Sequence, residues 1–128
     1  MQKSIKITIW IIFIIAIFLL AMMDFEGITG RKMNNDFALR HILAFSVYVI
    51  LSKITWSTWH ILKIIFAAIS LGIVIEISQE LFTAGVRNFH WQDLINDGIG
   101  IIIGLIIIIL FQLIKRGFGV AQSPPLGD

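Results

Sequence analysis

The sequence has acidic, amide and imidazole side chains, and several of them have spacings that would place them on one face of a helix. Glu76 and Gln79 are three residues apart, and Asp93 and Asp97 are four residues apart, so the members of each pair lie on one side of a helix. His41 lies within an apolar run of its own. A histidine that meets carboxylates is typical of general acid–base chemistry, and the same side chains can bind a divalent metal ion.

Other signatures of catalysis or cofactor binding are missing from the sequence. There is no cysteine, no pair of histidines four residues apart, no HExxH and no phosphate-binding glycine loop. These absences exclude disulfides and thiolate metal sites, and they argue against a metal anchored on one helix. We therefore predict no bound metal and no cofactor. Arg87 could hold a phosphate or a developing oxyanion. The residues whose types could ligate a divalent ion are His41, Glu76, Asp93 and Asp97.

The composition indicates what surrounds these side chains. Of the 128 residues, 58% are hydrophobic and 14% are charged, and the mean hydropathy is +0.93. Soluble domains carry about 45–50% apolar and roughly 25% charged residues. The excess apolar surface must face lipid, which argues against a soluble enzyme, a disordered chain and a nucleic-acid-binding module.

Four apolar stretches are long enough to cross a bilayer, which takes about 20 residues at ~1.5 Å each. We predict an all-α polytopic membrane protein with four transmembrane helices and short loops, over residues 5–23, 37–52, 59–82 and 94–114. These spans form one domain, 1–116, and segment 117–128 is predicted to be a flexible tail. Other interpretations are a hydrophobic hairpin in a soluble core and a first span that is a cleaved signal peptide. A signal peptide is disfavoured because Met22 and Met23 follow Ala21, where a small-x-small site is needed.

The distribution of Lys and Arg predicts the orientation of the spans. With the N-terminus in the cytoplasm, six of the ten basic residues flank the inner ends and four flank the outer ends, as the positive-inside rule favours. We predict a multi-pass protein of the inner (plasma) membrane with both termini cytoplasmic. Most acidic residues then lie at the outer ends: Asp24, Glu26, Asp36, Glu76, Glu80, Asp93 and Asp97.

Under this topology the polar residues of three helices and one loop meet at the outer ends. Glu76 lies about 6 Å deeper than Glu80, where contact with lipid is unfavourable, so Glu76 should face the bundle. Glycines continue the acidic stripes and are predicted to let the helices pack closely; they are Gly72, Gly100 and Gly104. We predict one polar ligand-binding site formed by His41, Glu76, Gln79, Arg87, Asp93 and Asp97.

At these residues the sequence resembles the VanZ-like family of small bacterial membrane proteins. The resemblance is carried by RHILAF (residues 40–45), IEISQELF (75–82) and RNFHWQDLINDGIGIIIG (87–104). The family pattern has a His followed by aromatics, then Glu-x-x-Gln, an Arg six residues before an Asp, an Asn or Asp four residues on, and two glycines. Many relatives have Asn where Asp97 stands, and Asp or Lys where Phe37 stands. The matching residues are His41, Glu76, Gln79, Arg87, Asp93, Asp97, Gly100 and Gly104.

The resemblance implies a polytopic inner-membrane protein, and the founding member of the family is linked to glycopeptide (teicoplanin) resistance. We predict an accessory or binding role in cell-envelope or lipid-linked metabolism, or in glycopeptide resistance. The partners would be the lipid bilayer and an envelope-lipid head group or a glycopeptide-like ligand, with no nucleic acid; an oligomer stays open. The alternative is an intramembrane enzyme that acts on a lipid head group by histidine–carboxylate acid–base chemistry. Transport is disfavoured because residues 64–75 and 101–110 are almost wholly apolar.

Overall fold

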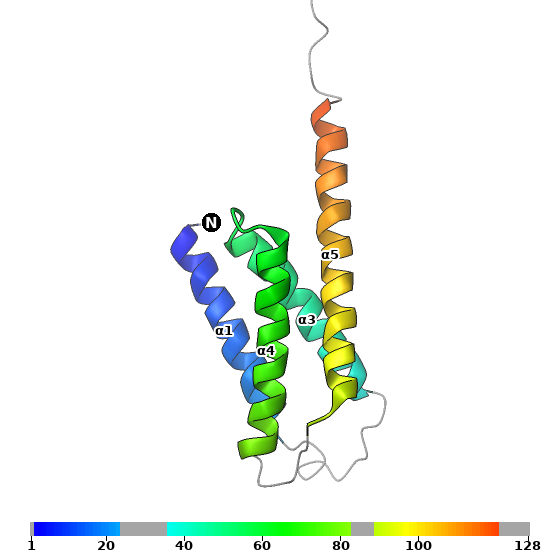
Figure 1. The fold of residues 1–128 in the computed structure, drawn as a ribbon. Coiled ribbons are helices and arrows are strands. Elements are labelled where there is room, and N and C mark those ends of the chain that lie inside the picture. Colours follow the sequence, from blue (N-terminus) through cyan, green and yellow to red (C-terminus); the bar gives the residue numbers. More distant parts are fainter. Residues whose placement is uncertain (1, 24–35, 83–88, 121–128) are drawn as a thin grey trace, which may run out of the picture.

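Four helices make up the computed structural model, which describes residues 2–23, 36–82 and 89–120 (Figure 1). They are α1 (Lys3–Met22), α3 (Asp36–Thr55), α4 (Ile61–Phe82) and α5 (Trp91–Val120). Each helix is long and apolar enough to cross a membrane. No residue in the described ranges belongs to a strand. The predicted all-α architecture with four membrane-spanning helices is confirmed.

Helix α5 extends further than the pattern of apolar residues indicates. It continues to Val120, whereas the apolar stretch ends at residue 114 and segment 117–128 is predicted to be a flexible tail. The first strong helix breaker in this region is Pro124, because proline lacks the amide hydrogen and clashes with the preceding turn. The first residues of the expected tail therefore belong to α5, and residues 121–128 lie outside the described part of the chain.

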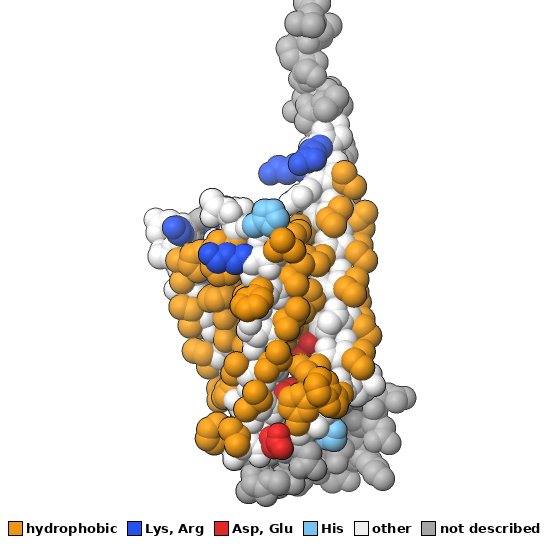
Figure 2. All heavy atoms as spheres, in the orientation of Figure 1, with side chains coloured by type: hydrophobic (Ala, Val, Ile, Leu, Met, Phe, Trp, Pro, Cys, Tyr) orange, Lys and Arg blue, Asp and Glu red, His pale blue; other side chains and the backbone are white. Residues whose placement is uncertain are grey.

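The outer surface of the bundle is apolar around its whole middle. In α1 only Ile17 is buried, while Ile12 and Leu19 expose 60% and 58% of their surface. The other three helices also direct large apolar side chains outward, and these cover the middle of the molecule in Figure 2. Lys and Arg side chains gather toward the upper end of that view. Such a surface is compatible with contact to the acyl chains of a bilayer, and the long apolar stretch of α1, which has no polar face, suits the same surroundings.

Successive helices run in opposite directions, so the bundle has two distinct ends (Figure 1). The aromatic end holds the start of α1 and the α3–α4 connection, and we name it after Trp10, Trp56 and Trp59. At the acidic end α1 and α4 finish and α3 and α5 begin, and we name it after its carboxylates. The start of α1 and the C-terminal part of α5 lie toward the same end of the molecule.

Helices α3 and α5 approach each other closely at two glycines. A Cβ atom on Gly100 would stand 2.5 Å from the backbone oxygen of Ile42, and one on Gly104 would stand 2.8 Å from the backbone oxygen of Ser46. The Ser46 hydroxyl in turn lies 2.9 Å from the carbonyl oxygen of Gly100. Only glycine allows backbones to come this near. This contact holds the N-terminal parts of α3 and α5 together, and those parts carry three of the polar residues of the acidic end.

Candidate functional site

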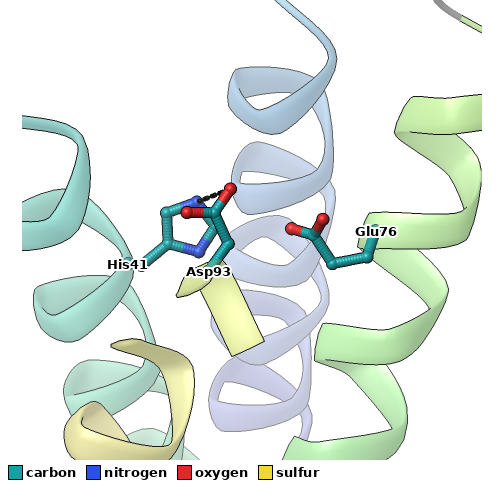
Figure 3. Close-up of side chains that lie close together, drawn as sticks. All are labelled: His41, Glu76 and Asp93. Atoms are coloured by element: carbon teal, nitrogen blue, oxygen red, sulfur yellow. Dashed lines mark ion pairs between the residues drawn. The ribbon is translucent and has the colours of Figure 1, made fainter. Parts of the chain in front are cut away.

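Four side chains from three helices gather at the acidic end, and we call them the polar cluster: His41 of α3, Glu76 of α4, and Asp93 and Asp97 of α5. Figure 3 shows the first three of them. Asp93 lies in the first turn of α5, where the partial positive charge of a helix N-terminus favours a carboxylate. Glu76 lies in the C-terminal half of α4 and receives no such support. Its placement in the cluster therefore depends on contacts with the other helices.

His41 contacts two carboxylates of α5. Its Nδ1 atom lies 2.7 Å from Oδ1 of Asp97, and its Nε2 atom lies 4.0 Å from Oδ2 of Asp93. An ionised carboxylate only accepts hydrogen bonds, so the Nδ1–H group donates to Asp97. This bond fixes the orientation of the ring, and it directs Nε2 toward Asp93. A histidine held in this way is suited to accept or deliver a proton, or to bind a metal ion.

Glu76 is completely buried, with 0% of its surface exposed. Its Oε2 atom accepts a hydrogen bond from the backbone N–H of His90 at 3.1 Å. Its Oε1 atom is buried and has no hydrogen-bond partner among the described residues. Figure 3 shows the carboxylate directed toward His41 and Asp93. A buried carboxylate oxygen without a partner is costly, so this atom is a candidate contact for something that the bare bundle does not supply.

Asp97 has a second buried oxygen in the same condition. Its Oδ2 atom has no hydrogen-bond partner in the part of the chain that the structure describes, and it lies against the backbone of α4 at Gly72. A Cβ atom on Gly72 would stand 2.8 Å from this oxygen. The missing side chain of Gly72 thus gives room to the carboxylate that orients His41. The glycine contributes to the site as well as to the approach of two helices.

Gln79 is the fifth predicted site residue that the structure describes. Gln79 is 1% exposed, and its Nε2 atom donates a hydrogen bond to the backbone oxygen of Ala21 at 2.9 Å. It thereby satisfies a carbonyl at the end of α1, where a helix has no intrahelical donor, and it ties α4 to α1. Arg87 lies outside the described residues, so its predicted role stays a prediction.

An apolar pocket of about 460 Å³ adjoins the polar cluster. Its walls come from three helices and are Ile17, Leu20 and Ala21 of α1, Arg40, His41, Leu43, Ala44 and Phe45 of α3, and Ile75 of α4. Leu20 and Leu43 are more than half exposed, so the pocket reaches the outer surface of the bundle. Volumes of about 300–1,000 Å³ are usual for sites that hold small molecules. His41 belongs both to this wall and to the polar cluster.

The sequence analysis did not identify the α1 residues of this pocket or the amide of His90 that binds Glu76. A uniformly apolar helix such as α1 has no period that marks one face, so its sequence holds no signal for a pocket. The bond from His90 uses a backbone group that every residue except proline has. Neither contribution depends on a recognisable side-chain type.

One known family matches most of the described chain. The model of the VanZ/LLP1 family matches residues 2–112. The chain belongs to the VanZ/LLP1 family. The resemblance in the sequence spans residues 36–110. The VanZ/LLP1 match also covers α1, the helix that supplies three of the residues that line the pocket. No curated protein and no solved structure gives a significant match.

Proposed function

We propose that the protein binds a lipid of the cell envelope at its acidic end. The lipid tail occupies the apolar pocket, and the head group reaches Arg40 and the polar cluster. The acidic end faces away from the cytoplasm, because six of the ten basic residues flank the opposite ends of the helices. This is a binding or accessory role in envelope metabolism, and in a VanZ/LLP1 protein it can affect susceptibility to glycopeptides of the teicoplanin type.

The observation that carries the proposal is the position of the pocket. Its mostly apolar walls include Leu20 and Leu43, which are more than half exposed, and also the charged and polar residues Arg40 and His41. An apolar space whose lining also includes a cationic and an imidazole side chain fits an amphiphile. A molecule that is polar throughout, such as a free sugar, would leave these walls without an apolar partner.

The polar groups beside the pocket indicate the kind of head group. Arg40 belongs to the pocket lining, and a guanidinium suits a phosphate. Glu76 and Asp97 each keep a buried acceptor oxygen without a partner among the described residues, which suits hydroxyl or amine donors. We therefore propose a head group that combines a phosphate with hydrogen-bond donors, as in a glycerophospholipid or a lipid-linked sugar phosphate.

The test compares two phenylalanine substitutions on α3. Ala44→Phe fills the pocket, whereas Val47→Phe adds the same ring at an exposed position, 40% accessible, that is not part of the pocket wall. We expect Ala44→Phe to weaken binding of phosphatidylglycerol to the purified protein by roughly tenfold, about 1.4 kcal/mol, as measured by native mass spectrometry. Val47→Phe should bind like the unchanged protein.

Two further arms locate the head group. Arg40→Gln should weaken phosphatidylglycerol binding but leave diacylglycerol binding unchanged, since only the former carries a phosphate. Glycerol phosphate without a tail should bind far more weakly than the lipid. Equal lipid binding by the unchanged protein and Ala44→Phe would contradict the proposal. In cells that express the protein, Ala44→Phe should also abolish any change in teicoplanin susceptibility that Val47→Phe retains.

A second candidate function rests on the bond between His41 and Asp97. A 2.7 Å contact between an imidazole nitrogen and a carboxylate is the arrangement that orients a general base for proton abstraction. The protein would then be an intramembrane enzyme that acts on the head group it binds. Comparison of membrane lipids in deletion and overexpressing cells distinguishes the two candidates, because a binding protein leaves the set of lipid species unchanged.

A further inference from the structure

Three side chains with metal-ligand atoms converge at the acidic end from three different helices. One ligand-type atom each of His41, Glu76 and Asp93 lies within 4.8 Å of those of the other two. A tetrahedral zinc ion holds nitrogen and oxygen ligands at about 2.0–2.2 Å, so two of its ligands lie about 3.4 Å apart. Side-chain shifts of about 1 Å would bring the three atoms around one ion.

The unpartnered oxygen of Glu76 is a second and independent observation. Glu76 is 0% exposed, its Oε1 atom has no hydrogen-bond partner within the described ranges, and its carboxylate is directed toward His41 and Asp93 in Figure 3. The other oxygen, Oε2, is already held by the His90 amide. The His90 amide therefore fixes the orientation of the carboxylate, and Oε1 is the oxygen that is left without a partner among the described residues. A cation there would compensate the burial of the charge.

Asp97 adds the support that metal-binding histidines usually have. Its Oδ1 atom accepts a hydrogen bond from Nδ1 of His41 at 2.7 Å, and the opposite ring nitrogen, Nε2, faces Asp93. In metal sites, a carboxylate on the far nitrogen of a ligating histidine orients the ring and makes it a stronger ligand. Asp97 itself lies behind the ring and acts through it.

We propose that His41, Glu76 and Asp93 bind one divalent transition-metal ion of the zinc or manganese type, and that Asp97 positions His41. One imidazole and two carboxylates are ligands that these ions accept. Three protein ligands leave a coordination position for a further molecule. The absence of paired histidines in the sequence argued against a metal held by one helix; here each ligand comes from a different helix. The inference rests on these side chains and does not require a lipid in the pocket.

The test is a titration of tag-free, chelator-treated protein in detergent. We expect Zn²⁺ to bind with a stoichiometry of one ion per chain by calorimetry. His41→Ala, Glu76→Gln and Asp93→Asn should each weaken binding by more than roughly tenfold, since loss of an outer-shell partner alone costs about 10–100-fold. Two matched controls should bind like the unchanged protein: Glu80→Gln, which makes the same carboxylate-to-amide change at an exposed position of α4, and His60→Ala, at an exposed histidine near the aromatic end.

A spectroscopic measurement separates a ligand from a structural residue. Co²⁺ in place of Zn²⁺ should give visible absorption bands, which Glu76→Gln alters although the amide can still accept the His90 hydrogen bond and keep α4 in place. Asp97→Asn should keep one ion per chain but weaken its binding by roughly 10–100-fold. Unchanged Zn²⁺ binding in both Glu76→Gln and Asp93→Asn, or no binding of Zn²⁺ and Mn²⁺ by the unchanged protein, would overturn the proposal. Ala44→Phe should leave Zn²⁺ binding intact, so failure of lipid binding and failure of metal binding are distinguishable.

Discussion

The two ends of the bundle differ in how their polar groups are hydrogen-bonded. At the aromatic end, Trp10 donates its indole N–H to the Ser52 hydroxyl at 2.9 Å. Lys53 donates to two backbone oxygens at 3.0 Å each, and Lys63 lies over the ring of Trp59. At the acidic end, one oxygen of Glu76 and one of Asp97 are buried without a hydrogen-bond partner among the described residues.

This difference supports a structural role for the aromatic end and a binding role for the acidic end. Stacked indoles and lysines that bind their own backbone are what a helix bundle needs where it meets the membrane–water interface. Within the described ranges, the aromatic end leaves one buried polar atom without a hydrogen-bond partner, the neutral indole nitrogen of Trp56. The unmatched atoms of the acidic end belong to carboxylates, whose burial costs far more when they are charged. A buried carboxylate without a partner lowers the stability of the fold. Such a loss of stability is expected where a protein binds a ligand.

The largest predicted effect comes from forcing the helices of the acidic end apart. Gly100→Ala places a methyl group against the backbone of Ile42, where neither helix can yield. We expect a loss of about 3 kcal/mol in the free energy of unfolding, measured by unfolding in detergent micelles. Gly98→Ala is the matched control, because nothing lies within 4 Å of the added atom. It should stabilise the helix by up to about 1 kcal/mol, and equal losses in both variants would refute the tight contact.

The fold could be predicted from the sequence because the membrane imposes a length on each helix. About 20 apolar residues are needed to cross it, and four such runs are visible without any knowledge of how they pack. The end of α5 was less predictable, since Lys115 and Arg116 close the apolar run while the helix continues to Val120. Charge ends the contact with lipid, whereas only a backbone constraint such as Pro124 is a strong reason for a helix to end.

The acidic end could be predicted only in part, for a reason that its residues make clear. The spacing of Asp93 and Asp97 places both on one face of α5, and the depth of Glu76 turns it toward the bundle. The contact between His41 and Asp97 joins residues 56 positions apart, and it depends on the approach of α3 to α5. Gln79 shares a helical face with Glu76, yet its amide donates a hydrogen bond to Ala21 of α1. Helical spacing predicts which residues share a face but not what that face meets.

A medium change in stability is expected from replacing the carboxylate of Glu76, which has a buried oxygen without a hydrogen-bond partner among the described residues. Glu76→Gln keeps an oxygen for the His90 amide but carries no charge, so the metal-free variant should be more stable than the unchanged protein by about 1–3 kcal/mol. Glu80→Gln, at an exposed position, should change stability by less than about 0.5 kcal/mol. Zn²⁺ at 100 times its Kd for the unchanged protein should reduce or reverse this difference, since it adds about 2.7 kcal/mol to that protein and less to the variant that binds it more weakly. A metal-free Glu76→Gln variant less stable than the unchanged protein would mean that the carboxylate is satisfied, and the contrast between the two ends would disappear.

The smallest effect sharpens the comparison from the aromatic end. Trp10→Phe keeps a ring between Tyr48 and Trp56 but removes the donor to Ser52, so it should cost about 1 kcal/mol, the usual worth of one hydrogen bond. Trp91→Phe makes the same change at the acidic end, on a side chain that is 73% exposed, and should cost close to nothing. Neither variant should alter Zn²⁺ or lipid binding, because neither Trp10 nor Trp91 is a proposed ligand or part of the pocket wall. If Trp10→Phe weakened Zn²⁺ binding, the two ends would be coupled through α3, and the division of the molecule into a structural and a binding end would fail.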